Sequence, residues 1–591
     1  MASPTVRRTG LPLDGLSLEA SSPPGTSGLV SGHLRLLGAE AEPRRTTPDV
    51  PGRITASGDG FGPVEVRMHA VNEASGVVDE ATAQAATGIM AVHGRRDGQP
   101  RGLALDYVSA ATGLLGVQGL LAGLLAEARG MRAHQVTTSL PRAGLLSVSQ
   151  YLAAEGADEE EACELSPGGP PFSSADGTVF ELETLDPTAW AAFWQALGAP
   201  RDAVRSGWRP FQFRYATACA PFPEVLHATT RDKSWQSIRA AADDSGAQVC
   251  ALRAVADRAA EHDGAAPWRL TELGAGPYEP TRPEAGTAPL AGVTVLEAGR
   301  RIQAPLTAHL LGLLGAEVIR IEPPGGDPLR GMPPACSGVS ARWLALNRGK
   351  QAAEVDIKSP SGRERLREMA AEADVFVHNW APGKAAQLGL DAGDLAAVNP
   401  CLVYSCTSGW AGRLQNAPMG TDFMVQARTG MGEAARPSGE PPAPSLMTLL
   451  DVMGGLLGTE TVLAALLQRE RYGHGVRADS SLLGAADILL APALRRAAEG
   501  RGTRRPAGFR RPLRTADGWV APADAHASEA AGHDLSGLTT ADAVDRLRAH
   551  GLAATAVTNR LTSLDHDARF AGLIRRDRHG AFAVPDPWSF A

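Results

Sequence analysis

The 591-residue sequence has few cysteines, and none of them is placed to hold a metal or a disulfide framework. The six cysteines form no CxxC pair and have no histidine at the spacing typical of zinc ligands. Secreted disulfide scaffolds and structural zinc sites both need such patterns. We therefore expect reduced thiols and no metal.

The sequence also lacks an excess of positive charge and a leader segment. Its net charge is −8 and its pI is about 6.0, which argues against nucleic acid as the main partner. Small anionic ligands need only a local basic site and stay possible. Residues 1–8 lead into no apolar stretch, so we expect no secretory signal and a cytoplasmic protein.

One apolar run could be mistaken for a membrane span. Residues 107–128 are mostly apolar and long enough to cross a bilayer. The corresponding run after Asp451 carries Thr459, Glu460 and Thr461 in its middle. A charged, hydroxyl-rich version of the same element is a poor span. We therefore expect two buried helices and no membrane partner.

The sequence contains two related copies of itself. Residues 36–40 and 313–317 both read Leu-Leu-Gly-Ala-Glu, 277 positions apart, whereas Gln84–Gly88 matches Gln426–Gly430 at 342 positions. The first copy therefore lacks about 65 residues that the second keeps. A long-period repeat usually indicates a solenoid. Two copies of this length instead indicate a fused dimer, in which each half can lose what the other supplies.

The repeat divides the chain into two parts joined by a linker. We expect copy one to span residues 11–275 and copy two residues 289–591. Residues 276–288, rich in Pro and Gly, are the expected linker.

Copy two begins as an α/β unit. The expected elements are strands at 293–296, 318–321, 352–357 and 375–377, and helices at 306–314 and 361–372. Strands that alternate with helices imply a parallel sheet, with ligands at the carboxyl ends of its strands. The loops there contain neither GxGxxG nor GxxxxGK[ST], so an ordinary dinucleotide or P-loop site is poorly supported.

Several motifs occur in order between residues 289 and 431. They are "PLAGVTVLEAGRRIQAP", "LNRGKQAAEVDIKSP", "ADVFVHNWAPGKAAQLGL", "NPCLVYSCTSGW" and "GTDFMVQARTGM". Together they resemble the family III CoA-transferases, with α-methylacyl-CoA racemase as a cousin. The resemblance covers copy two almost entirely and copy one more weakly, from 11 to 270.

The resemblance implies an α/β fold and an acyl-CoA substrate. Family members are dimers of interlocked rings, and each chain has a Rossmann-like large domain and a small domain. A tandem copy would form a pseudo-dimer from one chain, which we expect to be a monomer. The implied CoA contacts are Ile302, Gln303 and Ala304 of the first loop, and Asn379 and Trp380 after the third strand.

Two further positions bear on the phosphates of CoA. Arg330 corresponds to a family arginine after the second strand. The arginine that often follows the Asn-aromatic pair is Gln387 here, which puts one phosphate contact in doubt. Lys384 or Arg348 could substitute for it.

The resemblance also implies an aspartate nucleophile, thirteen residues after the Gln of the Gln-Ala-x-Ser/Thr-Gly motif. Copy two has Gly439 at that position, whereas copy one has Asp97. A carboxylate can attack a thioester and divide the exchange into easier steps. The alternative is that Asp97 belongs to an ordinary polar turn, because Asp-Gly is common in turns.

A glycine-rich loop of the family is kept only in copy one. Gly168 and Gly169 precede the Ala-Asp-Gly motif there, whereas copy two has Gly508-Phe509-Arg510-Arg511-Pro512. Backbone N–H groups of such a loop can stabilise oxyanions. Copy one therefore retains candidate chemistry and copy two retains candidate CoA binding.

Three other residues are secondary candidates. The racemase cousin uses a His-Asp pair whose aspartate corresponds to Asp451, but the histidine position before Asp422 is Thr421. Asp451 begins a helix and could instead cap its N–H groups; Asp106 is its nearest counterpart in copy one. His378 could act as a base or simply line its loop.

Two hypotheses for function follow. In the first, the chain transfers CoA between an acyl-CoA and a carboxylic acid at one composite site. In the second, the scaffold is repurposed: it binds an acyl-CoA or small acid, or catalyses another biosynthetic reaction. A racemase-like isomerase is a further alternative, disfavoured by Thr421.

Overall fold

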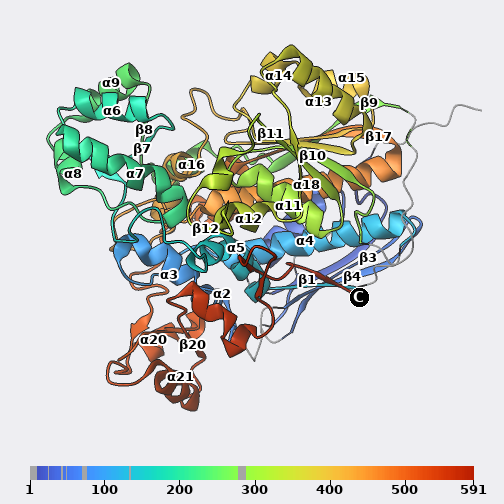
Figure 1. Cartoon of the computed structure of the whole chain (residues 1–591). Helices are drawn as coiled ribbons and strands as arrows, with labels where there is room; N and C mark the ends of the chain where they lie inside the picture. Colours follow the sequence, from blue (N-terminus) through green and yellow to red (C-terminus); the bar gives the residue numbers. More distant parts are fainter. Residues whose placement is uncertain are drawn as a thin grey trace, which may run out of the picture.

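The computed structural model of the chain describes residues 10–23, 25–40, 44–47, 50–69, 76–131, 135–276, 278 and 288–591. It has an α/β fold with two large sheets, one of six strands and one of seven, and two smaller three-stranded domains (Figure 1). The expected α/β class is confirmed. Most of the expected linker, residues 276–288, lies outside the described residues.

The seven-stranded sheet belongs to copy two and has the order β14-β11-β10-β15-β16-β17-β9. Its strands are β10 (Thr294–Ala298), β11 (Glu317–Glu322), β14 (Gln351–Glu354), β15 (Val375–His378), β16 (Val403–Ser408), β17 (His474–Ser481) and β9 (Trp268–Ala275). All neighbours are parallel except β9. Its helices are α11 (Gln303–Leu313), α12 (Ala341–Asn347), α13 (Pro360–Glu372), α14 (Lys384–Leu388), α15 (Ala392–Val398), α16 (Asp422–Thr429), α17 (Met431–Ala434), α18 (Leu449–Tyr472) and α19 (Leu482–Ala498). The strands and helices expected at the start of copy two are confirmed, except that the strand expected at 352–357 ends at Glu354.

The six-stranded sheet belongs mainly to copy one and has the order β2-β1-β3-β4-β5-β23. Its strands are β1 (Ser17–Ser22), β2 (Arg44–Arg45), β3 (Gly52–Gly58), β4 (Phe61–His69), β5 (Gln135–Ser139) and β23 (Ser589–Phe590), and its helices are α1 (Ser27–Leu36), α2 (Glu80–Ala86), α3 (Ile89–Gly94), α4 (Tyr107–Ala128) and α5 (Leu140–Glu155). In copy two, β15 lies between β10 and β16. Copy one has the antiparallel strand β3 in that place, joined to β4 as a hairpin. The shorter copy therefore fills its sheet with a hairpin, because it lacks the crossover that delivers β15.

The two halves exchange their last strands. β9 ends copy one but pairs with β17 of copy two. β23 ends copy two but pairs with β5 of copy one, so the C-terminus lies beside the copy-one strands (Figure 1). Main-chain hydrogen bonds in both sheets thus depend on both copies. This reciprocal exchange gives the single chain an interlocked, pseudo-dimeric architecture.

Each copy also has a small domain, and the two lie apart at the left and bottom of Figure 1. The copy-one domain contains β6 (Phe172–Ser173), β7 (Val179–Glu183), β8 (Gln248–Ala251), α6 (Pro187–Ala196), α7 (Arg201–Thr217), α8 (Glu224–Arg231) and α9 (Trp235–Ser245). The copy-two domain contains β18 (Leu513–Arg514), β19 (Trp519–Pro522), β20 (Ala554–Ala556), α20 (Ala527–Ala530) and α21 (Thr540–Ala549). Short elements elsewhere are α10 (Val255–Glu261), β12 (Ala335–Cys336), β13 (Val339–Ser340), β21 (Arg575–Arg576) and β22 (Phe582–Ala583).

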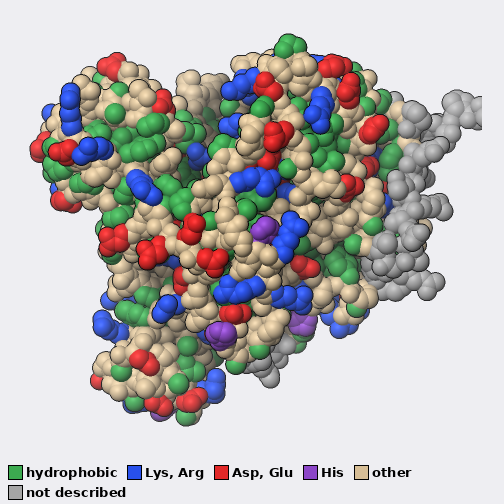
Figure 2. All heavy atoms as spheres, viewed as in Figure 1, with side chains coloured by type: hydrophobic (Ala, Val, Ile, Leu, Met, Phe, Trp, Pro, Cys, Tyr) green, Lys and Arg blue, Asp and Glu red, His purple; other side chains and the backbone are tan. Residues whose placement is uncertain are grey.

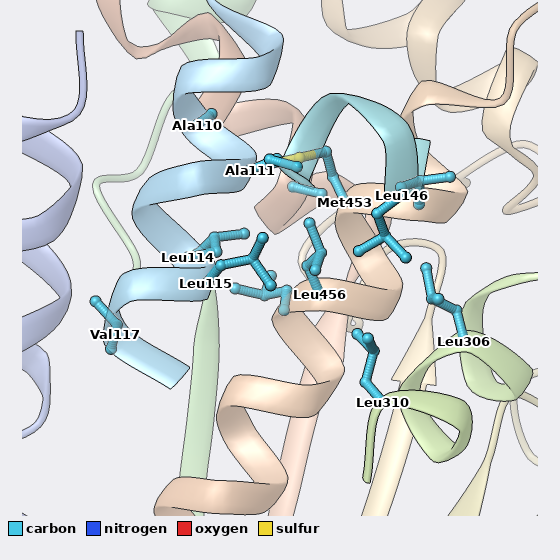
Figure 3. Packing of buried hydrophobic residues seen from close by; sticks show 14 of the residues in the cluster. Ala110, Ala111, Leu114, Leu115, Val117, Leu146, Leu306, Leu310, Met453 and Leu456 are labelled. Atoms are coloured by element: carbon cyan, nitrogen blue, oxygen red, sulfur yellow. The ribbon is translucent and has the colours of Figure 1, made fainter. Parts of the chain in front are cut away.

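The core between the sheets is built on α4 and α18, which pack against each other and against the two sheets. Figure 3 shows Leu114 and Leu115 of α4 facing Met453 and Leu456 of α18, with Leu306 of α11 beside them. These are the two helices long and apolar enough to cross a membrane, and their apolar windows are 100% and 94% buried. Their burial confirms the expectation of core helices.

Acidic and basic side chains are mixed over the face of the molecule shown in Figure 2. That face has no continuous basic expanse of the kind that tracks a nucleic acid backbone.

Candidate active site

The first turn of α18 is held by a buried carboxyl–amide network in copy two. The Gln426 amide donates to Asp422 and to the carbonyl of Ser445, whose N–H donates back to Gln426 at 2.8 Å. Asp422 Oδ2 accepts the backbone N–H of Asp451 at 2.8 Å. Asp422 thus caps the helix, as carboxylates commonly do. The side chain of Asp451 is left free of this network.

Asp451 lines a cavity of about 360 Å³ between the two halves. Copy two contributes Arg301, Ile302, Arg320, Asp327, Pro328, Leu329, Met332, Arg342, Trp343, Leu346, Asn347 and Asp451, and copy one contributes Gln150, Gln212, Phe213, Tyr215 and Ala216. The wall from copy one comes mainly from α7, and its aromatic rings give the cavity an apolar side. The cavity is therefore composite.

The environment of Asp451 makes its carboxyl unusually basic. Burial raises the pKa of Asp451 to about 6; the nearby charge of Arg301 opposes this shift and that of Glu183 adds to it. Burial and the charge of Asp451 also raise the pKa of Asp422 well above its ordinary value. Like charges in a shared buried site drive such shifts. Asp451 is thus the member of the pair that is mostly ionised at neutral pH.

The loop that resembles the family's CoA-contacting segment lies at the same cavity. Ile302 lines it, and Arg301 has a left-handed backbone with φ of +63°. Gln303, the first residue of α11, is buried, and its Nε2 has no hydrogen-bond partner among the described residues. A Cβ on Gly454 would lie 2.6 Å from that nitrogen, so the amide packs one turn after Asp451. Ala304 is fully buried behind the loop.

Asn379 and Trp380 lie next to the same loop but on another side. The amide of Asn379 exchanges two 2.9 Å hydrogen bonds with the backbone of Arg300, which fixes the first loop to the third. Trp380 lines a separate cavity of about 630 Å³ over β16 and β17. The third loop therefore positions the first loop. Trp380 and Ile302 line different cavities.

His378 is held in place by two hydrogen bonds. Its Nδ1 accepts the N–H of Trp380 at 3.2 Å, so its Nε2 carries the proton that faces Tyr404 at 2.8 Å. Burial lowers the pKa of His378 to about 3, with a contribution from Arg477. The neutral, doubly bonded ring orients its loop and is poorly suited to be a base.

None of the candidate contacts to the phosphates of CoA lines the Asp451 cavity. These are Arg330, Arg348, Lys384 and Gln387, which stands where the family often has an arginine. Arg330 forms an ion pair with Glu322 at 2.7 Å and stacks over Trp343 at 3.9 Å. Arg348 donates to the carbonyl of Phe582 at 2.9 Å in a different cavity. Lys384 and Gln387 are exposed on α14.

Asp97 also lies outside the Asp451 cavity. Arg436 binds both of its carboxylate oxygens, at 2.8 and 3.2 Å, and Arg101 lies 3.3 Å from one of them. Burial opposes ionisation, but these hydrogen bonds and charges hold the pKa of Asp97 below its usual range. In this arrangement Asp97 joins the two halves as an ion-pair partner.

The glycine loop of copy one reaches copy two. The N–H of Gly168 donates to Arg96 at 3.0 Å, which places the loop beside the Asp97 turn. Gly169 has a φ of +138°, and a Cβ there would lie 2.6 Å from Leu446, five residues before Asp451. A side chain at Gly169 would therefore meet the segment that leads into the site.

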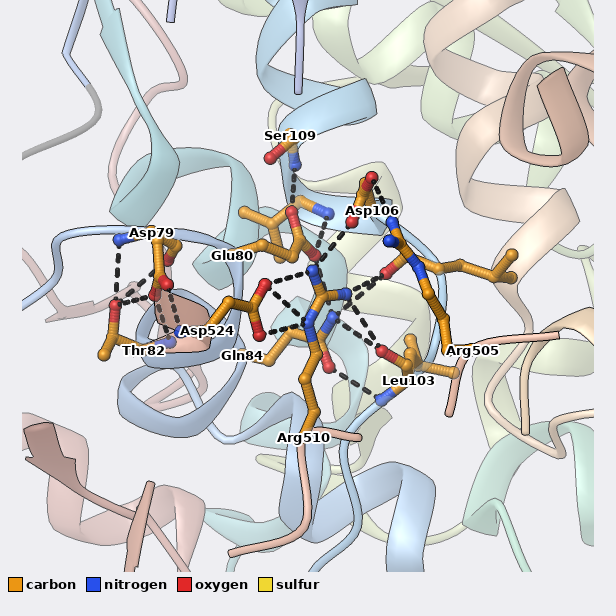
Figure 4. A network of polar contacts seen from close by, with 12 residues as sticks. Asp79, Glu80, Thr82, Gln84, Leu103, Asp106, Ser109, Arg505, Arg510 and Asp524 are labelled. Carbon is orange, nitrogen blue, oxygen red and sulfur yellow. Dashed lines mark hydrogen bonds and ion pairs between the residues drawn. The ribbon is translucent and has the colours of Figure 1, made fainter. Parts of the chain in front are cut away.

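The corresponding place in copy one is closed by an ion network (Figure 4). Glu80 and Gln84 correspond to Asp422 and Gln426, and Glu80 Oε2 accepts the N–H of Ser109 at 2.7 Å. Ser109, not Asp106 as the sequence comparison suggested, is therefore the structural counterpart of Asp451. The reason is that both residues hold the same helix-capping bond, 342 positions apart.

Arg510 fills the copy-one site from the loop that replaces the paired glycines. Its guanidinium bonds Asp106 and Asp524 at 2.7 Å and the carbonyls of Leu103 and Leu105. Its side chain is 2% exposed, and its φ of +53° is left-handed. At the copy-one site, Arg510 thus fills the space that the glycine loop leaves empty at the copy-two site.

Sequence reasoning missed Tyr215, Arg301 and Ser109. The 342-position offset pairs Asp451 with Ser109 and could have shown the loss of a second carboxylate. No signal in the sequence assigns α7 to the other copy's cavity, because that contact depends on the packing of the two halves.

Comparison with known proteins shows the family of the chain. The sequence model of CoA-transferase family III matches residues 43–275 and again 290–533, so more than half of the chain is covered and the chain belongs to this family.

Similar proteins match one part of the chain. The chain is 36% identical over 201 residues to the succinyl-CoA:glutarate CoA-transferase of Mus musculus, and the match covers 33% of this chain and 45% of that protein. It is 34% identical over 218 residues to the acetyl-CoA:oxalate CoA-transferase of Acetobacter aceti, covering 36% and 56%. The chain spans about half the length of the curated relatives it matches. A solved CAIB/BAIF family protein from Brucella suis is 26% identical with a TM-score of 0.46, covering 50% of this chain and 91% of that one.

Proposed function

We propose that the chain transfers CoA between an acyl-CoA and a carboxylic acid at one composite site, with Asp451 as the nucleophile. The observation that carries this proposal is the cavity between the halves, in which Asp451 faces the loop of Ile302. The relatives named above act on CoA thioesters and carboxylic acids, which supports the same substrate classes. The single site makes a monomer sufficient for activity.

The carboxylate of Asp451 attacks the thioester carbonyl, the C–S bond breaks, and a mixed anhydride and CoA thiolate result. The thiolate then attacks the aspartyl carbonyl and releases the donor acid. An acceptor carboxylate attacks the aspartyl-CoA thioester, the C–S bond breaks, and a second mixed anhydride and CoA thiolate result. The thiolate then attacks the acyl carbonyl of the acceptor, which forms the new acyl-CoA and releases the carboxylate of Asp451. Covalent capture lets the site exchange two acids without losing CoA.

Gln303 is a candidate donor for the oxyanion of these steps, because it directly follows Ile302, which lines the cavity. Its buried Nε2 has no partner among the described residues, and leaving such a donor unpaired costs about 1–3 kcal/mol. A developing negative charge on the thioester oxygen would satisfy it. Preorganised donors of this kind stabilise a transition state more than a ground state.

Asp97 is the alternative nucleophile from sequence reasoning, and one experiment separates it from Asp451. The protein is incubated with succinyl-CoA or acetyl-CoA, treated with hydroxylamine, and digested for peptide mass spectrometry. We expect the modification on the peptide that contains Asp451. Modification of the Asp97 peptide would move the nucleophile to copy one, and absence of any modified aspartate would favour a repurposed scaffold.

The isomerase alternative has less support. Among the residues that the structure describes, no histidine lines the cavity around Asp451, and Thr421 donates its hydroxyl to Glu183 at 2.9 Å. A racemase needs two proton-transfer groups on opposite sides of the substrate carbon. Thr421, bonded in this way, is not a second base.

A further inference from the structure

A third cavity lies behind the Asp451 site, where copy one meets the C-terminal segment. It has a volume of about 350 Å³ and is lined from α5, α11, α12 and residues 572–589. Helix α12 separates the two cavities, because Leu346 and Asn347 face the first and Ala345 and Arg348 face the second. The proposed transfer reaction uses no residue of this third cavity.

Positive charge in this cavity exceeds negative charge. Arg142, Arg348 and Arg575 line it, whereas Asp586 is the only acidic residue of its lining within the described part of the chain. Arg142 donates to the backbone carbonyl of Asp586 at 2.6 Å and has no carboxylate within ion-pair distance among the described residues. The carboxylate nearest to Arg348, Asp577, is 3.8 Å away. Burial lowers the pKa of both Arg142 and Arg348, and the charges of Asp586 and Asp577, respectively, oppose this shift.

A neutral donor stands beside these cations. His309 is buried in the cavity wall, and burial together with Lys350 and Arg348 lowers its pKa to about 3. A neutral imidazole can donate one hydrogen bond to an anion without adding charge. Phe582 and Leu313 supply apolar wall next to the basic groups.

We infer that this cavity binds a small molecule with an anionic head, phosphate or carboxylate, and an apolar body. Arg142 and Arg348 would hold the head from opposite halves of the chain, and His309 would add a neutral donor. Guanidinium groups bind both anions through paired, charge-assisted hydrogen bonds. A bound ligand would then supply the negative charge that the cavity lacks.

Isothermal titration calorimetry of the full chain with inorganic pyrophosphate and with hexanoate tests the inference. The first probe represents phosphate ligands and the second carboxylate ligands. We expect at least one to bind, and we expect Arg348→Gln and Arg142→Gln each to weaken that binding by about tenfold or more. The probe that binds identifies the head group.

Three controls make the result decisive. Arg205→Gln removes an exposed cation far from the cavity, and Lys384→Gln removes a candidate CoA contact; neither should change binding by the probe. Thermal unfolding of each variant shows whether it folds, and Arg575→Gln replaces any that does not. Failure of both probes to bind at millimolar concentration, or binding that the cavity variants leave unchanged, would overturn the inference.

Discussion

The first turns of α4 and α18 are held by similar hydrogen bonds but carry different side chains. In copy two, Asp422 and Gln426 hold a helix whose first turn presents Asp451 to a cavity. In copy one, Glu80 and Gln84 hold the equivalent helix, but Ser109 stands in the place of Asp451. The helix-capping network is present in both copies, while a carboxylate that faces a cavity is present only at the described copy-two position.

The loops that cover these two helix starts also differ between the copies. Gly169 of copy one approaches Leu446, in the segment that leads to Asp451, without a side chain. The loop that approaches the copy-one site carries Arg510, whose guanidinium is buried in four polar contacts. A fused dimer needs only one working site, so the second can exchange catalytic groups for groups that hold the halves together.

Replacing the two counterpart residues should separate catalysis from architecture. Asp451→Asn removes the proposed nucleophile, so we expect transfer to fall by roughly 10³-fold or more. Ser109→Ala changes the equivalent position in the closed site and should leave transfer near its original rate. Steady-state rates of CoA exchange measure both, with circular dichroism as the check of folding. Comparable losses in the two variants would mean that both sites work.

Removing the arginine that fills the closed site should cost stability. Arg510→Ala leaves Asp106, Asp524 and two carbonyls without their buried cation, and breaking such pairs costs about 3–5 kcal/mol. Arg511→Ala, at the adjacent exposed position, is the matched control. Urea unfolding measures both. A change within the error of the Arg511 control would show that Arg510 does not hold the halves together.

The comparison also shows which features the sequence could reveal. The α/β order of copy two was predictable because each strand and helix is a local pattern, and the strands at 293–296 and 318–321 are confirmed as β10 and β11. The repeat predicted two interdependent halves, because aligning the sequence with itself shows which segments one copy lacks and the other keeps. The hairpin of β3 and β4, however, fills a gap in a sheet that exists only after folding.

The site was less predictable for the same reason. The thirteen-residue spacing identified a loop but not which carboxylate faces a cavity. Arg436, which binds Asp97, is 339 residues away in the sequence. Likewise, Gly508–Pro512 showed a lost glycine pair, but only packing shows that Arg510 takes up the space.

The two small domains also differ in a buried carboxyl group, which should make stability depend on pH. Strand β7 buries Glu181, which has no hydrogen-bond partner among the described residues, whereas the corresponding strand β19 carries no carboxylate. Burial raises the pKa of Glu181 to about 8; Arg214 opposes the shift and Glu183 adds to it. Glu181 therefore binds its proton more tightly in the folded state than in the unfolded state.

The free energy of unfolding should consequently fall as pH rises from about 4.5 to 8. Glu181→Gln removes the titration, and we expect it to be more stable than the original protein at pH 8 by roughly 1–3 kcal/mol. At pH 4 the two should be similar. Denaturant unfolding across this range checks the expectation, and identical pH profiles would contradict it.

The smallest expected effect concerns the pH dependence of transfer. Attack requires ionised Asp451, and its pKa is raised to about 6. Lowering the pH to 5 should protonate most of this carboxyl and reduce kcat/KM by about tenfold, because ionisation falls tenfold per unit below the pKa. Carboxylic acid acceptors with ordinary pKa values stay largely ionised there. Arg301→Gln removes a cation that opposes the shift, so the acidic limb should move to higher pH. A limb unmoved in that variant would assign the titration to a group other than Asp451.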